Sequence, residues 1–430
     1  MKAIEKSGYG ACAFGAGALA VAGCLVVLLS ATPAFAKQIP RSAALARAWC
    51  FGNNSKITRA QQFNGCNAVI EGKLAPVKRI ADAHLNRGVI YLGNDEIDSA
   101  IEDFSELIRL APKRDDAHSN RGEAYRRKGE FDRAIVDFDR AIALNQRESA
   151  AWFNRGIAYS DKGDPDHAIA DYNEAIKRKS NDPWYYNNRG NSHSDKNDLD
   201  RAMADYNHAI KLDPKFALAY FNRGNAHRRN GDEARSLADF NMSIKLDPQY
   251  AAAYGNRGRL FRDRGDIDRA IADLDRSLQL DPAGHRNAYA RGNIYFDRHD
   301  YPRALSDYDE AIRLEPTYAA ALNARCFARA ITGRAKDALV DCDESLRLRP
   351  NDAYTLDSRA FCHLKLGEFD TAIEGYTAAL SVNPKLANAL YGRGIARRSK
   401  GDAAGADSDI AAAKAIYADI ANEFRHYGVE

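Results

Sequence analysis

The sequence has almost no surplus of charge of either sign. Its 62 lysine and arginine residues face 59 aspartate and glutamate residues. The first 36 residues contribute only Lys2, Lys6 and Glu5, so the remainder carries 60 basic and 58 acidic residues. Nucleic acids and anionic membrane surfaces attract proteins through a strong positive excess. Neither is therefore an expected partner.

The sequence also lacks the motifs that mark common active sites. It contains no nucleophile elbow, phosphate-binding loop, His-Glu-x-x-His or EF-hand loop. The ten histidines are scattered singly, and the cysteines are too widely spaced to predict a zinc site. We therefore expect a chain that is not an enzyme and that needs no cofactor or metal.

Long hydrophobic runs are missing everywhere except near the N-terminus. Residues 11–30 are uncharged and largely apolar, and they follow the positive charges of Lys2 and Lys6. A Thr-Pro break comes next, and then small residues suited to cleavage after Ala36. This order predicts a signal peptide over residues 1–36 and export to a bacterial periplasm or beyond the cell.

Two alternatives for this segment stay open. The apolar run is 20 residues long, which is enough to span a bilayer as an uncleaved anchor facing the periplasm. Residues 21–24 resemble a lipoprotein box, which would place a lipid on Cys24. Lipidation would leave the apolar run 25–29 at the start of the mature chain, so cleavage after Ala36 is preferred.

What the sequence does have is a strict period of 34 residues, marked by an arginine in every copy. The ten arginines are Arg87, Arg121, Arg155, Arg189, Arg223, Arg257, Arg291, Arg325, Arg359 and Arg393. Glycine follows eight of them, and Cys326 and Ala360 follow the other two. A fixed period of this length means one small unit copied and stacked.

Residues 115–148 show what one unit is. Apolar and small residues recur at intervals of three and four, the period of a helix, before and after a break at Lys128-Gly129. Gly129 can adopt a positive φ and so end the first helix. Each unit is therefore predicted to be a helix, a turn and a second helix. Counting from the start of the unit, the arginine is its seventh residue.

Other positions of the unit are equally regular. The twentieth is small in every copy, the twenty-fourth is usually aromatic, and proline closes seven copies. Glycine, alanine, aromatic and proline residues at these offsets resemble the tetratricopeptide repeat family over residues 81–420. The resemblance implies an all-α fold, a right-handed α-solenoid superhelix of about ten helix-turn-helix units with a concave groove. Tryptophan, commonest at the fourth position of the family, occurs there only at Trp152.

The arginines have regular acidic counterparts. Sixteen residues after the arginine, nine of the ten units carry aspartate, and only Gly375 departs. Two antiparallel helices joined by a short turn bring such positions close together. We predict internal Arg–Asp ion pairs, in preference to a stripe that binds phosphate or carboxylate ligands.

Asparagine fills the sixth position of six consecutive units: Asn86, Asn120, Asn154, Asn188, Asn222 and Asn256. In the family this position faces the groove, and an amide can hold both polar groups of a peptide unit. Further groove candidates are Asn191, Asn225, Phe153, Trp184, Phe221 and Tyr289. The resemblance thus implies a binding surface for an extended peptide. The alternative is that asparagine is simply frequent here in the family.

Charge and polarity vary along the predicted groove. Arginines and aspartates mix near the ends of the first helices, which disfavours a strongly acidic ligand. Residues 82–263 predict a polar surface, and residues 320–365 a drier one that includes Phe327, Ile331 and Phe361.

Five cysteines lie beyond the predicted signal peptide. Cys50 and Cys66 are 16 residues apart, and so are Cys326 and Cys342. The second pair occupies the eighth and twenty-fourth positions of one unit, on facing helices. Both pairs are predicted disulfides in an oxidising compartment, with small buried thiols as the alternative. Cys362 remains single.

The ends of the chain do not follow the repeat. Residues 37–80 predict an N-terminal cap of two helices with a disulfide. At the other end an apolar stripe through Ile410, Tyr417 and Phe424 predicts that the last helix continues into residues 421–430 as a cap.

These observations predict a non-enzymatic scaffold that binds an extended peptide or protein segment in its groove, for envelope complex assembly or secretion. One alternative is a structural subunit that oligomerises through its convex face or its ends, with the groove empty or self-occupied. A second is a module that binds glycan or peptidoglycan through groove aromatics. The identity of the partner and the oligomeric state do not follow from the sequence.

Overall fold

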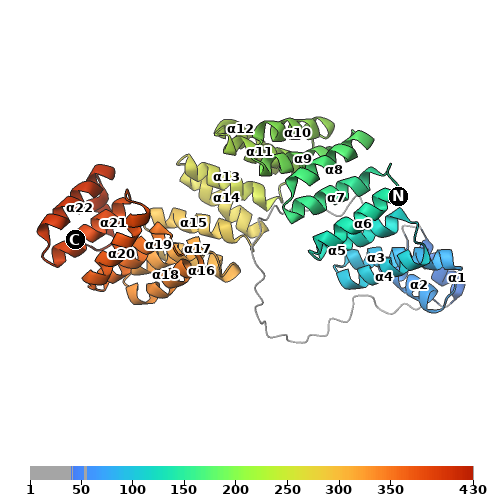
Figure 1. Cartoon of the computed structure of the whole chain (residues 1–430), viewed down its shortest axis with the longest axis horizontal. Coiled ribbons are helices and arrows are strands. Elements are labelled where there is room, and N and C mark those ends of the chain that lie inside the picture. Colours follow the sequence, from blue (N-terminus) through green and yellow to red (C-terminus); the bar gives the residue numbers. More distant parts are fainter. Residues whose placement is uncertain (1–39, 41, 53–55, 430) are drawn as a thin grey trace. The chain divides into compact units, whose positions relative to one another are not determined.

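A computed structural model describes residues 40, 42–52 and 56–429 (Figure 1). The described chain forms 23 α-helices and no strand. The predicted signal peptide and the Cys24 lipidation site lie outside the described residues. None of the described helices combines the length and the apolar character that a bilayer-spanning segment needs.

The chain divides into two compact units, residues 1–128 and residues 129–430. The helices of the first unit are α1 (Ala43–Phe51), α2 (Arg59–Glu71), α3 (Val77–Gly93), α4 (Ile97–Leu110) and α5 (Asp115–Arg127). Here α1 pairs with α2 and α3 pairs with α4.

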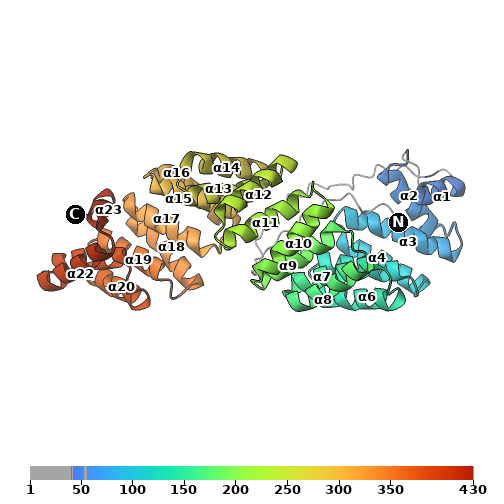
Figure 2. The same ribbon diagram turned by 90° about the horizontal axis from the view of Figure 1, so that it is seen from above.

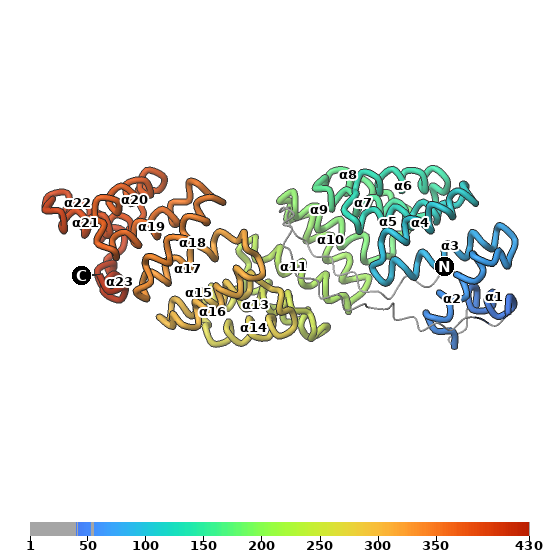
Figure 3. The backbone as a smooth tube through the Cα atoms, turned by 90° about the horizontal axis from the view of Figure 1, so that it is seen from below, coloured from blue at the N-terminus to red at the C-terminus, as the bar shows by residue number. Residues whose placement is uncertain are grey.

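The second unit begins with α6 (Phe131–Leu144) and continues as eight antiparallel hairpins (Figures 2 and 3). The first helices of these hairpins are α7 (Ser149–Lys162), α9 (Pro183–Asp195), α11 (Ala217–Arg229), α13 (Ala251–Asp263), α15 (His285–Asp297), α17 (Ala319–Ile331), α19 (Ala353–Lys365) and α21 (Ala387–Ser399). The second helices are α8 (Pro165–Arg178), α10 (Leu199–Leu212), α12 (Glu233–Leu246), α14 (Ile267–Leu280), α16 (Tyr301–Leu314), α18 (Ala335–Leu348), α20 (Phe369–Val382) and α22 (Ala403–Ile416). The short helix α23 (Ile420–His426) follows. The predicted helix-turn-helix units and all-α fold are confirmed.

Local signals set the turn inside each hairpin. α7 ends at Gly163, whose φ of 84° is a left-handed conformation that glycine adopts without strain. The side chain of Asp164 then accepts a hydrogen bond from the backbone N–H of His167 and caps α8. Asn197, with a φ of 61°, takes the glycine's place before Asp198 and α10.

In several hairpins the two helices approach closely because glycine at the eighth position meets an aromatic ring at the twenty-fourth. A Cβ on Gly190 would lie 2.7 Å from Cε1 of Tyr206, which is a clash. The Tyr206 ring is almost wholly buried, and its hydroxyl donates to Oδ1 of Asn191 at 2.9 Å. Where glycine follows the arginine, it therefore fixes the spacing of the hairpin.

The N-terminal cap is itself a hairpin of the same kind. α1 and α2 pack as a pair, and Cys50 and Cys66 take the places that glycine and the aromatic ring hold elsewhere. The sequence did not reveal this because α3 begins at Val77, one turn before the predicted boundary at residue 81, and this extra turn breaks the period.

The prediction of one continuous C-terminal helix is wrong. α22 ends at Ile416, and Tyr417 adopts extended dihedral angles, with φ −139° and ψ 101°. α23 then turns away from the direction of α22 (Figure 2). Tyr417 is 43% exposed, so it does not share the buried stripe of Ile420 and Phe424.

Candidate functional site

The repeated arginines are internal ion-pair partners, as predicted. Among the described residues at least eight of them hold the aspartate 16 positions on through two hydrogen bonds. Arg155, for example, donates from Nε to Oδ2 of Asp171 at 2.7 Å and from Nη2 to Oδ1 at 2.6 Å. The eight arginines are Arg87, Arg155, Arg189, Arg223, Arg257, Arg291, Arg325 and Arg393.

The same arginines also join neighbouring hairpins. The third nitrogen, Nη1, reaches back to the second helix of the preceding hairpin. Arg189 donates from Nη1 to Asn173 at 2.6 Å, and Arg223 donates to Asn207 at 2.6 Å. Each guanidinium thereby holds two second helices in register. Because their donors are occupied, these arginines are not a ligand-binding stripe.

The first helices of the second unit form a continuous row. Most neighbouring pairs in this row, such as α9 with α11 and α17 with α19, contact each other directly. The second, fifth, sixth and ninth positions of these helices lie on one side, since they are three or four residues apart. We call this side the inner stripe.

All twelve predicted groove residues are half-buried. Two of them, Asn86 and Asn120, belong to the first unit. Asn86 donates from Nδ2 to the carbonyl of Cys50 at 2.9 Å, and Asn120 donates to the carbonyl of Asp116 at 2.7 Å. Both amides therefore already hold backbone of the first unit.

The asparagines of the second unit are engaged only in part. Asn188 donates from Nδ2 to the carbonyl of Trp184 at 2.9 Å, and Asn222 donates to Oδ1 of Asn187 at 3.0 Å. In the part of the chain that the structure describes, Oδ1 of both asparagines accepts no hydrogen bond, and the amide of Asn154 makes none. These atoms are available to a ligand.

The aromatic residues of the inner stripe pack against their neighbours. Phe153 lies 4.6 Å from Tyr185, and Trp184 lies 4.7 Å from Phe216, between ring centroids. Phe221 packs edge-on to Tyr250 at 4.9 Å, and Tyr289 packs in the same way to Tyr318 at 5.1 Å. The rings thus line the stripe with fixed apolar edges between the amides.

One further residue of the inner stripe, Arg259 on α13, was not among the predicted groove residues. It stands at the ninth position, where neighbouring units carry Asn191, Asn225 and Asn293. Its guanidinium donates from Nη1 to Oδ1 of Asn287 at 2.5 Å and from Nη2 to Oδ1 of Asn256. The sequence feature that could have identified Arg259 is a basic residue at a position where neighbouring units carry asparagine.

No carboxylate pairs with Arg259 among the described residues. Burial lowers the pKa of Arg259 to about 10, and the positive charges of Arg228, Arg262 and Arg286 add to this effect. The inner stripe is therefore locally electropositive, although the chain as a whole is nearly neutral.

The drier surface predicted at residues 320–365 is covered by the chain's own C-terminus. Phe424 and Tyr427 are 2% and 5% exposed, and Tyr427 meets Phe327 and Phe361 at 5.2 and 5.9 Å. Phe424 packs against Tyr391 at 4.7 Å. The helix α23 thus occupies this end of the inner stripe.

Polar contacts hold the end of α23. Lys365 donates from Nζ to the carbonyls of Tyr427 and Gly428 at 2.9 and 3.1 Å. A cation suits the C-terminal end of a helix, where carbonyl groups lack partners. Burial raises the pKa of Asp297, which Glu423 of α23 raises further against the opposing effect of Arg262.

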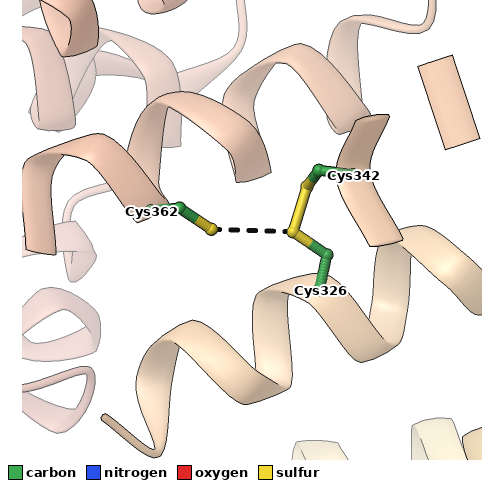
Figure 4. Close-up of side chains that lie close together, drawn as sticks. All are labelled: Cys326, Cys342 and Cys362. Atoms are coloured by element: carbon green, nitrogen blue, oxygen red, sulfur yellow. Dashed lines mark hydrogen bonds between the residues drawn. A yellow bond between two sulfur atoms is a disulfide. The ribbon is translucent and has the colours of Figure 1, made fainter. Parts of the chain in front are cut away.

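Three cysteines gather between α17, α18 and α19 (Figure 4). Cys326 and Cys342 form a close sulfur pair with Cα atoms 5.6 Å apart, and Sγ of Cys362 lies 3.6 Å from Sγ of Cys326. All three are fully buried, and burial raises the pKa of Cys362 to about 12. The Cys326–Cys342 and Cys50–Cys66 pairs have the proximity that disulfides require; their oxidation stays a prediction.

Two open hollows lie on the described surface of the second unit. One measures about 410 Å³ and involves the turn from Arg264 to Asp268. The other, about 360 Å³, lies over the Arg189–Asp205 ion pair. Neither hollow is lined by the predicted groove residues.

Comparison with protein families finds matches along most of the repeat region. Models described as "Tetratricopeptide repeat" match residues 81–114, 119–183, 217–250, 234–285, 286–318 and 363–419, and one described as "TPR repeat" matches residues 190–231. A comparison with curated protein sequences finds no match.

One solved structure shares the fold, and two others are similar to parts of the chain. The Cut9–Hcn1 heterotetramer of the APC/C is 15% identical, with 82% of this chain and 86% of that chain covered and a TM-score of 0.51. A tetratricopeptide repeat protein from Parabacteroides merdae is 19% identical over 57% of this chain and 97% of that one, with a TM-score of 0.48. Pilf of Pseudomonas aeruginosa is 19% identical over 47% and 92%, with a TM-score of 0.43.

Proposed function

The chain belongs to the tetratricopeptide repeat family, and on that premise we propose that it is an exported, non-enzymatic scaffold that binds an extended polypeptide segment. The binding site is the inner stripe of the second unit, from Phe153 on α7 to Asn293 on α15. This binding serves the assembly of envelope protein complexes or protein secretion.

The observation that carries the proposal is the arrangement of the amides. Asn154, Asn188 and Asn222 recur at steps of 34 residues on neighbouring first helices and retain unused hydrogen-bonding atoms beside packed rings. An extended segment has a carbonyl and an N–H in every peptide unit, so such a row can hold it with little dependence on its sequence.

Mutation of the three amides tests the proposal. Asn154, Asn188 and Asn222 are replaced together by alanine, and partners are captured by crosslinking from the native envelope. The proposal expects that heterologous partners retained by the wild type are lost. Asn230→Ala, at the exposed end of α11, is the matched control and should keep them. Retention of every partner by the triple variant would contradict the proposal.

A second candidate function is that of an assembly subunit whose inner stripe is filled by its own chain. The position of Tyr427, just beyond α23, over Phe327 and Phe361 favours it, since that part of the stripe is already occupied. Light scattering separates the two candidates. A stable multimer whose partners are unaffected by the triple variant favours assembly, and a monomer with lost partners favours segment binding.

Export is part of the proposal and has its own test. Cleavage after Ala36 predicts a mature protein that begins at Lys37 and fractionates with the periplasm or the medium. N-terminal sequencing of the native protein decides the matter, because a retained anchor would leave the start at residue 1 and a lipoprotein would start at Cys24.

A further inference from the structure

Arg259 is held in place as a ligand-binding residue would be. A chain of hydrogen bonds runs across three neighbouring first helices through its guanidinium. Asn256 donates from Nδ2 to Oδ1 of Asn225 at 2.5 Å, and Arg259 donates to both Asn256 and Asn287. Asn287 in turn donates to Oγ of Ser277 at 2.9 Å.

This network fixes the plane of the guanidinium without satisfying it. A guanidinium has five N–H donors in a rigid fork. The two amide oxygens use one hydrogen on Nη1 and one on Nη2, so the Nε–H and two further N–H groups remain. Because the two amide oxygens are neutral, they also leave the positive charge of Arg259 uncompensated.

The surroundings of Arg259 add positive charge. Arg228, Arg262 and Arg286 stand near enough to disfavour its ionised form. Of these, Arg262 donates to the carboxylate of Asp263 at 2.7 Å. The repeated arginines, by contrast, each hold a carboxylate or a polar side chain in the neighbouring second helices. A half-buried arginine without a carboxylate is costly in a folded protein unless an anion joins it.

We propose that Arg259, oriented by Asn256 and Asn287 and flanked by Arg228 and Arg286, is a subsite for an oxyanion carried by the bound segment. The oxyanion is a side-chain carboxylate or a phosphate group, since both match the fork of a guanidinium. The proposal rests on the proposed function, because it places an acidic residue of the segment at a defined point of the inner stripe. One anionic group suffices, which agrees with the mixed charges along the rest of the stripe.

The test uses the full mature chain and small anions, so that it does not depend on knowing the partner. Sodium phosphate and sodium acetate are titrated at constant ionic strength, and binding is measured by calorimetry and by the rise in Tm. We expect saturable binding of at least one of the two to the wild type. Phosphate alone points to phosphorylated segments, and acetate with or without phosphate points to acidic side chains.

Substitutions assign the binding to this position. Arg259→Gln keeps a side chain that can contact the two asparagines but removes the charge, and at least a tenfold loss of anion affinity is expected. Arg259→Lys keeps the charge but not the fork and is expected to lose affinity to a smaller degree. Arg235→Gln is the matched control, because Arg235 is an exposed arginine paired with Asp232 on α12, and it should bind as the wild type does.

Stability gives a second readout that separates a binding role from a structural one. Without the anion, Arg259→Gln removes an uncompensated charge, so its Tm should equal or exceed that of the wild type. A structural role predicts a lower Tm and unchanged anion affinity, and this result would overturn the proposal, as would equal anion affinity in Arg259→Gln and the wild type. This test is separate from that of the proposed function. If the Asn154, Asn188 and Asn222 triple variant keeps its partners and still binds the anion, the segment-binding function is rejected and the anion site is retained.

Discussion

Gly375 of α20 lies against Ala360 of α19, and the two residues together replace an ion pair. A Cβ on Gly375 would stand 2.9 Å from Cβ of Ala360. In the other units the twenty-third position, that of Gly375, carries the aspartate that binds the repeated arginine. The eighth position, that of Ala360, is most often glycine. Here Arg359 has no such aspartate, donates instead to Asp343 at 2.9 Å, and is 45% exposed along its side chain. In this hairpin an aspartate at the twenty-third position would meet the Ala360 methyl, whereas the hairpin of α17 and α18 accommodates both Cys326 and the paired Asp341.

The replacement of the ion pair by Ala360 and Gly375 predicts that the effects of mutations at these two positions on stability are strongly coupled. Gly375→Asp alone should lower the free energy of unfolding by about 1–3 kcal/mol, because the new side chain meets the Ala360 methyl. Ala360→Gly together with Gly375→Asp makes room and restores the Arg–Asp pair with Arg359. A double-mutant cycle in urea should give a favourable coupling of at least about 1 kcal/mol. Simple additivity of the two changes would contradict this account.

The repeated ion pairs predict a large cost for loss of one partner. Asp239 and Arg223 have side chains that are 8% and 21% exposed. Asp239→Ala leaves the arginine buried and unpaired, so the free energy of unfolding should fall by about 3 kcal/mol. Asp268→Ala breaks the surface pair with Arg298, whose members are 88% and 49% exposed, and should cost less than about 1 kcal/mol. Equal losses in the two variants would show that burial does not set the cost.

Asp357 on α19 predicts a pH dependence of stability. Burial raises the pKa of Asp357 to about 8, above the value of about 3.9 expected in the unfolded chain. Between these values the folded state binds more protons than the unfolded state, so the contribution of this group is present at low pH and is lost as the pH rises toward 8. Asp357→Asn should flatten this loss, giving a stability gain over the wild type that is larger by roughly 2–4 kcal/mol near pH 8 than near pH 5. Urea unfolding at the two pH values measures it, and parallel curves for the two proteins would refute it.

The sulfur cluster predicts selective reactivity. Because Cys362 is fully buried and its pKa is raised to about 12, iodoacetamide should leave it unmodified in the folded protein and modify it after unfolding. In Cys342→Ala, oxidation should join Cys326 to Cys362, whose sulfur atoms lie 3.6 Å apart. Mass spectrometry of unreduced digests maps both outcomes. Rapid alkylation of Cys362 in the folded wild type would contradict the burial.

The C-terminal helix predicts local exposure when its anchor is removed. Phe424→Ala deletes the ring that packs against Phe361 and Tyr391, so α23 should detach while the hairpins stay folded. Hydrogen exchange should rise at least tenfold over α23 and the end of α19. Tyr417→Ala, at an exposed ring, is the control that should leave exchange unchanged. Global unfolding of Phe424→Ala would instead show that α23 is an integral part of the core.

Much of the fold was predictable because the repeat copies short-range relations. The 16-residue spacing that joins Arg155 to Asp171 also separates Cys326 from Cys342, and both pairs meet across one hairpin turn. The predicted amides proved half-buried on the first helices, but some of their partners, such as Asn187 for Asn222, lie in the neighbouring hairpin. The period states that hairpins repeat and does not state which side chains meet between them.

By itself, the sequence determined the period, the two helices of each unit and the residues that pair within a unit, because a short turn leaves a helical hairpin only one way to close. The tertiary structure alone decided that Arg259 lies among amides, with no carboxylate partner in the described part of the chain, and that Phe424 and Tyr427 return to cover Phe327 and Phe361. Those relations depend on how successive hairpins pack and on where the chain end finds apolar surface, which no local pattern of residues encodes.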